Sequence, residues 1–345
     1  MRQLVITLAL YALLSIAGAQ GSLQERVQLF GTLRLQWSDT QGASGSDGFN
    51  IRMMRFGARF QIDEQTTGNL QVEFASGDGG YTSELLDVFL TWRPNSQITV
   101  YAGQMLAPLF YDVREGITVL ETLERGNTTR TLLRGTRLRG SYVAYRLNPQ
   151  NTLEVGLWNS LTYRDLQMEA RGGQAAVAGT LSWRYSNGDT QLTVGGLVGT
   201  RPRLQGRDAQ NNPIEVPKHE RRLFYAELEQ RVPGLPLTIR ADYLWGRDRN
   251  PAGGTTPRFL TPSDFETLFL YAVYDLTSRQ QLVLAWEDFD PDTRRAGDRL
   301  QTLSLTYHYF AQERVRFSAR YEWNTEERGS RIPNDRVLFV AQYRY

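Results

Sequence analysis

The amino-acid sequence predicts an all-β fold, a 16-stranded antiparallel transmembrane β-barrel with a long third extracellular loop that folds inward. Three observations predict it. Many segments alternate between apolar and polar residues, short turns and long loops follow each other along the chain, and aromatic residues gather near the segment ends. These features are typical of a barrel whose strands face lipid on one side and a polar lumen on the other.

The N-terminal segment is expected to direct export. Met1 and Arg2 precede an apolar stretch over 4–14, and Ala17 and Ala19 fit a small-residue cleavage site. The stretch is too short for a membrane-spanning helix, which needs about 20 apolar residues. We therefore expect residues 1–19 to be a cleaved signal peptide and residues 20–345 to form one barrel domain in the bacterial outer membrane.

Composition excludes several other classes of protein. The 345 residues carry 39 Lys+Arg against 37 Asp+Glu, a net charge of +2 that makes a nucleic-acid carrier unlikely. The chain has no cysteine, so disulfide scaffolds, thiol nucleophiles and thiolate metal sites are excluded. Lys218 is the one lysine, so almost every positive charge is a guanidinium group.

Alternation with a period of two residues marks the strands in order. The first strand is predicted over 27–37, where Leu29, Leu33 and Leu35 share one side with Trp37. In the fourth, Leu86 shares the apolar side with Leu90. The same pattern, less regular in places, predicts further strands at 54–62, 70–74, 86–92, 97–104, 136–147, 153–157, 177–185, 192–198, 224–228, 237–245, 264–275, 279–289, 303–309, 315–323 and 337–345.

The connections alternate in length. Even-numbered joints such as 93–96 and 148–151 are short and rich in turn residues, whereas odd-numbered joints such as 105–135 and 202–219 are long. Short periplasmic turns opposite long extracellular loops are typical of outer-membrane barrels. The last strand has apolar residues at alternate positions up to Tyr345, which resembles the signal that the barrel-assembly machinery recognises.

A soluble secreted all-β protein is the main structural alternative. It predicts neither the difference in loop length nor aromatic residues at the strand ends on the apolar side. Such residues are frequent here: Trp37, Trp92, Trp183, Tyr185, Tyr243, Trp245, Tyr307, Tyr309, Tyr321, Trp323, Tyr343 and Tyr345. They fit the interfacial girdles of a membrane barrel, which we favour.

Sixteen strands enclose an aqueous lumen, so function is expected on the polar side of the strands. Closing the barrel brings the last strands beside the first and places many arginines on one side, which we call the basic wall. It consists of Arg34, Arg55, Arg59, Arg314, Arg316, Arg320, Arg336 and Arg344, with Glu322 as its carboxylate.

The long connection at 105–135 is expected to carry its own structure. Thr118 and Glu121 fit a capping box and Gly126 a helix stop, which predicts a short helix between them. If this loop enters the lumen, its carboxylates face the basic wall and create a transverse field that selects permeants. Alternatively, the arginines only pair with carboxylates and stiffen the barrel. The candidate constriction residues are Arg34, Arg55, Arg59, Arg316, Arg320 and Arg336 on the wall and Arg114, Glu115, Glu121, Glu124 and Arg125 in the loop.

Three segments resemble the phosphate-selective porins O and P. Residues 48–57 are similar to that family's arginine-rich second strand, 103–110 to its motif before the constriction loop, and 123–125 to its Glu-Arg segment. The resemblance implies an outer-membrane channel, commonly a homotrimer, that admits anions past an arginine-lined constriction. Leu106 replaces the motif's lysine and Phe110 its last glycine, so a general diffusion porin of weak selectivity stays open.

An enzyme or an adhesin in a barrel is less favoured. His308 shares the polar side with Ser304, but no third orienting group accompanies the pair, and a lumenal histidine is the simpler interpretation. Asp288, Asp290 and Asp292 begin like a calcium loop that fails at Thr293 and Arg299, although an acidic surface loop near lipopolysaccharide stays open. We predict no catalytic residue, metal or cofactor. The expected partners are small hydrophilic or anionic solutes, outer-membrane lipid and lipopolysaccharide, the barrel-assembly machinery, and further copies of the chain.

Overall fold

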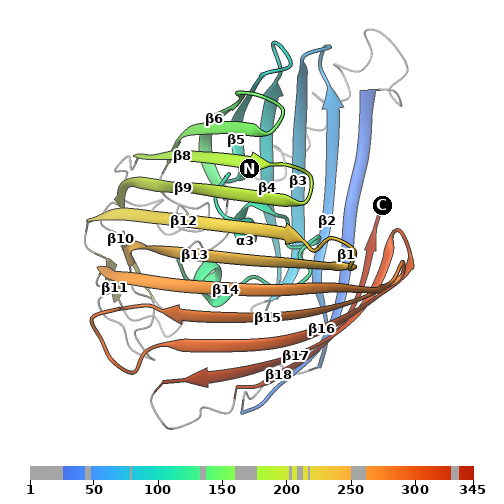
Figure 1. The fold of residues 1–345 in the computed structure, drawn as a ribbon, viewed down its shortest axis with the longest axis vertical. Coiled ribbons are helices and arrows are strands. Elements are labelled where there is room, and N and C mark those ends of the chain that lie inside the picture. Colours follow the sequence, from blue (N-terminus) through green and yellow to red (C-terminus); the bar gives the residue numbers. More distant parts are fainter. Residues whose placement is uncertain are drawn as a thin grey trace.

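The computed structural model describes residues 26–42, 48–77, 80–132, 137–159, 177–201, 204–207, 213–216, 218–249, 262–327 and 334–345. Sixteen of its strands close into one antiparallel barrel (Figure 1). These are β1 (Val27–Thr40), β2 (Gly48–Gln61), β3 (Thr66–Gly77), β4 (Gly80–Trp92), β5 (Ile98–Leu106), β6 (Arg137–Arg146), β7 (Asn151–Asn159), β8 (Val177–Ser186), β9 (Thr190–Arg201), β12 (His219–Arg231), β13 (Leu237–Arg249), β14 (Pro262–Thr277), β15 (Gln280–Asp290), β16 (Leu300–Gln312), β17 (Val315–Glu326) and β18 (Arg336–Arg344). The predicted signal peptide lies outside the described residues.

Each strand of the barrel pairs with its neighbours in sequence, and β1 closes the ring by pairing with β18. The closing register runs from Thr32 opposite Arg344 to Thr40 opposite Arg336. Antiparallel neighbours can be joined by very short turns, and asparagines complete several of them. The Asn95 side chain accepts hydrogen bonds from the amides of Gln97 and Ile98, at 2.9 Å each.

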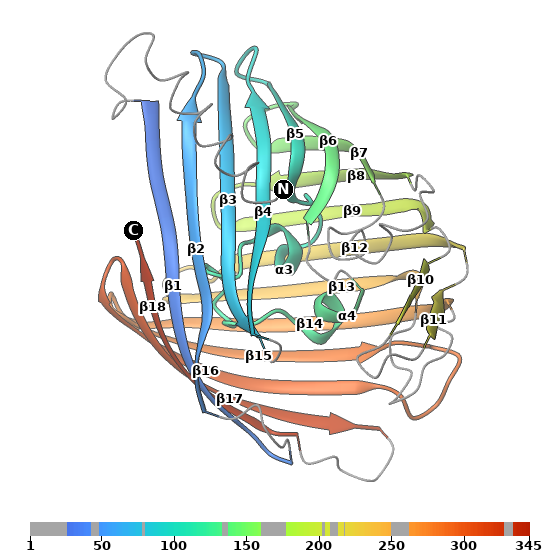
Figure 2. The same cartoon turned by 180° about the vertical axis from the view of Figure 1, so that it is seen from behind.

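The strand ends that border the long connections lie on the opposite rim from the short turns. The connection between β9 and β12 contains a small hairpin of β10 (Leu204–Arg207) and β11 (Pro213–Val216), and the one between β5 and β6 contains two short helices, α3 (Tyr111–Arg114) and α4 (Asn127–Leu132) (Figure 2). Among the described residues, no helix is both long enough and apolar enough to cross a membrane. The joint between β3 and β4 is the exception to the predicted pattern, because it spans only residues 78–79.

The outer face of the barrel carries the apolar side of the alternation, as predicted. Leu29, Leu157 and Leu181 expose more than half of their surface there, and the tyrosines and tryptophans at strand ends join them. Among these aromatic residues, Trp92, Tyr243, Trp245, Tyr307, Tyr309, Trp323, Tyr343 and Tyr345 are exposed. On the inner face of the same strands, arginines and carboxylates are buried.

Four pairs of described strands carry register shifts, and those in β4 and β2 bear on the predictions. In β4 the pairing with β3 passes from Asp87 to Leu85, so Leu86 is the extra residue. Leu86 is 1% exposed while Leu85 is 50% exposed. The expectation that Leu86 lies on the outer side is therefore wrong, because an inserted residue reverses the alternation beyond it. In β2 the shift leaves Arg52 as the extra residue opposite β1.

Part of the lumen is filled by an apolar core. Inward residues of β12–β14, among them Tyr225, Leu244 and Phe269, pack with Phe110 and Val113 from the β5–β6 connection. The inner face of these strands is therefore partly apolar, because it packs against protein instead of water, and charged residues such as Glu227 and Arg240 lie among the apolar ones.

Candidate channel constriction

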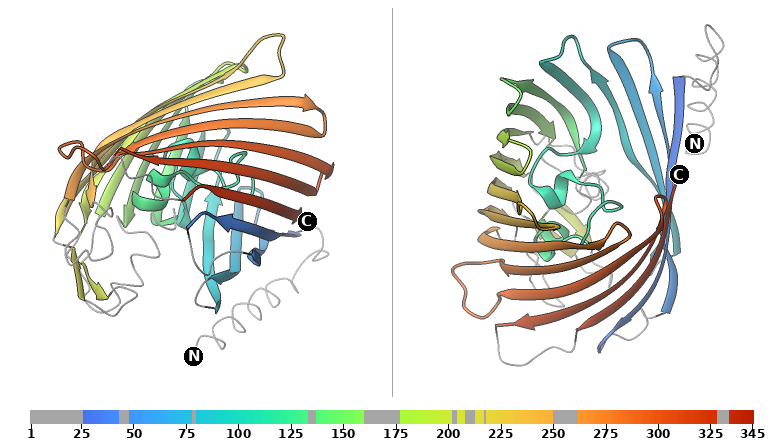
Figure 3. Two further views of the ribbon diagram at one scale, coloured as in Figure 1. Left: turned by 90° about the horizontal axis from the view of Figure 1, so that it is seen from below. Right: turned by 45° about the vertical axis from the view of Figure 1, so that its right-hand side comes forward.

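Residues 107–132 of the β5–β6 connection, here called the third loop, lie within the ring of strands. Figure 3 shows their two helices enclosed by the barrel. The loop contacts inward side chains on opposite sides of the ring, so its position is fixed from both sides, as described below. The predicted inward loop is therefore the central feature of the lumen.

The basic wall holds the loop by its backbone carbonyl groups. Arg34 on β1 donates to the carbonyl oxygen of Leu123 at 2.8 Å, and Arg316 on β17 donates to that of Leu120 at 3.4 Å. His308 lies 2.7 Å from the carbonyl oxygen of Glu121, and its other ring nitrogen lies 2.8 Å from the Ser318 hydroxyl. His308 is thus a lumenal histidine that orients the loop.

The helix predicted between Thr118 and Gly126 is wrong. The segment forms turns, Leu123 has a positive φ of 65°, and Gly126 precedes α4 instead of ending a helix. Side chains of the wall bind the carbonyl groups that a helix would use internally. Contacts with the rest of the protein therefore override the local capping signal.

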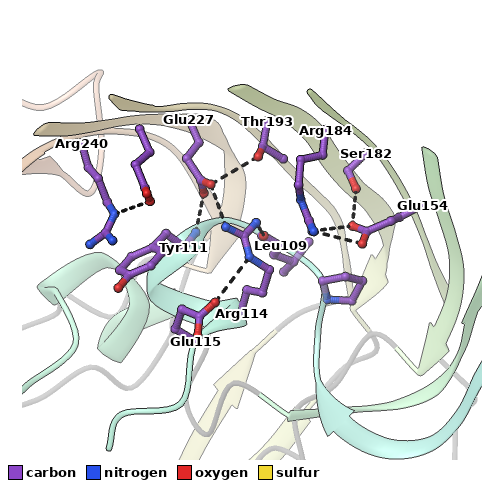
Figure 4. A network of polar contacts seen from close by, with 12 residues as sticks. Leu109, Tyr111, Arg114, Glu115, Glu154, Ser182, Arg184, Thr193, Glu227 and Arg240 are labelled. Atoms are coloured by element: carbon purple, nitrogen blue, oxygen red, sulfur yellow. Dashed lines mark hydrogen bonds and ion pairs between the residues drawn. The ribbon is translucent and has the colours of Figure 1, made fainter. Parts of the chain in front are cut away.

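Carboxylates on β12 and β15 hold the amide groups of the loop. Glu227 on β12 accepts hydrogen bonds from the Tyr111 amide at 2.6 Å and from Arg114 Nη2 at 2.7 Å (Figure 4). Glu287 on β15 accepts from the amides of Asn127 and Thr128 at 2.6 and 2.8 Å. The first amides of each helix lack partners within the helix, so an acidic acceptor satisfies them.

Glu121 links the loop to β13. It accepts a hydrogen bond from the Tyr111 hydroxyl and lies 3.1 Å from Arg240 Nη1. The Arg240 guanidinium also lies over the Tyr111 ring, 4.0 Å from its centroid, in a cation–π contact. Arg240 further pairs with Glu229 at 2.8 Å, so two carboxylates share this one guanidinium group.

Glu124 has the opposite surroundings, since two arginines share it. Arg52 Nη2 lies 3.4 Å and Arg34 Nη1 3.9 Å from its carboxylate. Burial alone would raise the pKa of Glu124, but the attraction of Arg52 and Arg34 outweighs burial and lowers the pKa to about 2. Glu124 is therefore ionised throughout the physiological range.

A second charged cluster lies within the loop itself. Arg125 donates to the carbonyl oxygen of Glu115 at 2.7 Å, and burial lowers the pKa of its guanidinium to about 10 despite the nearby Asp112. Asp112 accepts a hydrogen bond from the Gly126 amide at 3.1 Å, and its burial raises the pKa of the carboxyl group. Glu115 lies 3.9 Å from Arg114 and keeps 39% of its side chain exposed.

The predicted arginines of the basic wall differ in their surroundings. Arg34, Arg316 and Arg320 are buried beneath the third loop, and Arg320 pairs with Glu322 at 2.7 Å. Arg336 lies 3.9 Å from the same carboxylate. Arg55 pairs with Glu73, whereas Arg59 is exposed towards the end of β2 and makes no ion pair with any described residue.

Sequence reasoning missed two charged residues near the loop. Arg52 is 38% exposed and enters the lumen because of the bulge in β2. Arg137 at the start of β6 binds Asp87 through two parallel contacts of 2.9 and 3.0 Å. Arg52 lies three residues before the predicted wall residue Arg55, but alternation alone assigns Arg52 to the outer side.

Comparisons with known proteins agree with this architecture. The family model described as phosphate-selective porin O and P matches residues 30–208. No curated protein sequence matches the chain significantly.

Three solved structures show the same fold at low sequence identity. OmpT of Vibrio cholerae in its trimer form has a TM-score of 0.62 at 14% identity, over 92% of this chain and 99% of that chain. The outer membrane channel DcaP of Acinetobacter baumannii has a TM-score of 0.63 at 14% identity, over 92% and 97%. An anion-selective porin from Comamonas acidovorans has a TM-score of 0.62 at 11% identity, over 92% and 99%.

Proposed function

Since the chain belongs to the phosphate-selective porin O and P family and is an outer-membrane channel, we propose that it conducts small anions in preference to cations. The passage runs between the third loop and the barrel wall, and its selectivity comes from the excess of guanidinium groups there. The channel does no covalent chemistry.

One observation carries the proposal. Glu124 and Glu322 are each shared by two arginines, Arg34 and Arg52 for the first and Arg320 and Arg336 for the second. Arg316 lies beside them and pairs with no described carboxylate. Among the described residues of this site, five guanidinium groups thus face two carboxylates in surroundings of low dielectric, where fixed charge acts strongly on permeants.

The covered and the exposed arginines act differently. Arg34, Arg316 and Arg320 contribute a positive potential without touching the solute, because the loop covers them. Arg52 and Arg336 have partly exposed side chains and are the groups that a passing anion meets. On the loop, the exposed Glu115 supplies the opposite side of a transverse field.

A general diffusion porin of weak selectivity is the second candidate. The ion pairs of Arg55 with Glu73 and of Arg114 with Glu227 favour it, because paired charges brace the barrel without attracting anions.

We also propose a homotrimer, as in the OmpT trimer form, with a cleaved signal peptide, recognition of the last strand by the barrel-assembly machinery, and contact with lipopolysaccharide.

The test is the reversal potential of purified protein in a planar bilayer under a potassium chloride gradient. We expect a potential of the sign that anion preference gives, reduced in Arg52→Gln and Arg316→Gln. Arg279→Gln is the matched control, because that arginine is exposed in the short turn between β14 and β15, outside the basic wall. Equal chloride and potassium permeability would exclude the anion channel and leave the general porin, and added phosphate as competitor would test the phosphate-type form.

A further inference from the structure

Four neighbouring strands each place one aromatic ring on the lumenal side. Phe89 on β4, Tyr101 on β5, Tyr142 on β6 and Trp158 on β7 follow one another around the wall, with ring centroids 6.4, 4.3 and 5.7 Å apart. Tyr101 and Tyr142 are nearly parallel, at 6°. We call these four residues the aromatic row.

The row belongs to the lumen and not to the lipid-facing girdle. Its members pack against the apolar core inside the barrel, whereas Val143 and Tyr145 on β6 are exposed on the outer face. Trp158 is buried, but Phe89, Tyr101 and Tyr142 are only half-buried. Part of each of these three rings therefore faces the open lumen.

The rings lie against each other, so they present mainly their edges and the tyrosine hydroxyl groups. Ring edges carry partial positive charge and attract the face of another aromatic ring. A flat aromatic solute can therefore be held edge to face by the row. A small inorganic anion has no aromatic face with which to make this contact.

Spare hydrogen-bond donors lie beside the row. Glu154 lies opposite Ala144, two residues along β6 from Tyr142, and its oxygens accept from Arg184 Nη2 at 3.1 and 3.2 Å and from Ser182 at 3.0 Å (Figure 4). Arg184 donates only through Nη2 to described residues, and its side chain is 27% exposed. The acceptors are thus occupied, while the guanidinium keeps donors for a carboxylate.

We propose that the aromatic row and Arg184 form a binding site for aromatic carboxylates, which pass the channel more slowly than inorganic or aliphatic anions because they bind there. This inference rests on the proposed function, since it supposes that anions enter the lumen. It adds a class of solute that interacts with the wall through its ring as well as its charge.

The experiment uses the full channel in a planar bilayer and measures block of the chloride current by benzoate, with acetate as the matched aliphatic anion. We expect benzoate to block at a concentration about tenfold lower than acetate. Tyr101→Ala with Tyr142→Ala should remove this difference, and Arg184→Gln should weaken benzoate more than neutral benzyl alcohol. Tyr145→Ala, on the outer face of β6, is the control and should behave as the unchanged protein.

Equal block by benzoate and acetate in the unchanged protein would overturn the proposal, as would a difference that persists in the double variant. If the double alanine variant does not assemble, Tyr101→Leu with Tyr142→Leu keeps the bulk and removes the rings. Because block is compared at one salt concentration, it is independent of the reversal potential that tests anion preference.

Discussion

At the scale of single residues, shared carboxylates are the main feature of the constriction. Glu124 holds Arg52 and Arg34 together, and it also lies in the loop whose backbone Arg34 binds. Its charge both reduces the local positive potential and helps to fix the loop. The two effects can be separated. Neutralising Glu124 changes the local potential directly, whereas it moves the loop only if contacts of the loop are lost.

Replacing Glu124 with Gln should increase anion preference, because one of two carboxylates is removed from five arginines. The pKa of Glu124 is lowered from 4.5 to about 2, so its stabilising charge is fully present above pH 4.5 and is lost as the pH falls through 2. The difference in reversal potential between the unchanged protein and Glu124→Gln should therefore persist at pH 4, fall to about half near pH 2 and vanish only below it. A difference already lost at pH 4 would contradict this account.

At the scale of elements, the strands were predictable and their irregularities were not. The periods at 27–37 and 337–345 predict β1 and β18 because each has one lipid-facing side. The bulges at Arg52 and Leu86 have no equivalent signal, since the alternating runs begin only at Met54 and Leu86 and do not cross them. A bulge depends on the partner strand, which a single segment does not reveal.

Gly103 in β5 is a further irregularity, a positive φ within a strand, and it can be tested by substitution. Its φ is +140°, and a Cβ there would meet the backbone of β4 at Val88 and Phe89. Gly103→Ala should therefore destabilise the barrel by about 2 kcal/mol, measured as a lower unfolding midpoint in detergent. Gly234→Ala is the control, because Gly234 also has a positive φ, of 77°, in a turn with open space around it. Equal effects of both changes would assign the loss to φ alone.

At the scale of the whole molecule, the third loop and the barrel form one body. Most of the charged residues of the candidate site were predictable. Glu121 and Glu124 lie in a long connection, and Arg34 and Arg316 lie on the polar sides of strands. Their partners were not predictable, because the folding of the loop and not the alternation decides which carbonyl or carboxylate each arginine meets. For the same reason the apolar lumenal core around Phe110 was missed.

Phe110→Ala should therefore affect the whole molecule. Phe110 is completely buried between the loop and the barrel, and such a change typically costs about 3–5 kcal/mol. We expect a lower unfolding midpoint together with larger and noisier single-channel conductance, because the loop loosens within the pore. Val119→Ala, at an exposed position of the same loop, is the control and should change neither quantity. A destabilised barrel with unchanged conductance would show that the loop holds its position without this contact.

The lumenal core also sets how the protein responds to its solvent. The outer surface of the barrel stays in an apolar environment when lipid is replaced by detergent. The contacts around Phe110, Tyr225 and Leu244, in contrast, lie inside the barrel. Their stabilisation comes from apolar surface withheld from water, whose exposure raises the heat capacity. The free energy of unfolding of this core should therefore depend on temperature with the curvature seen in water-soluble domains. Cooling below ambient temperature should weaken the lumenal core before the lipid-facing wall.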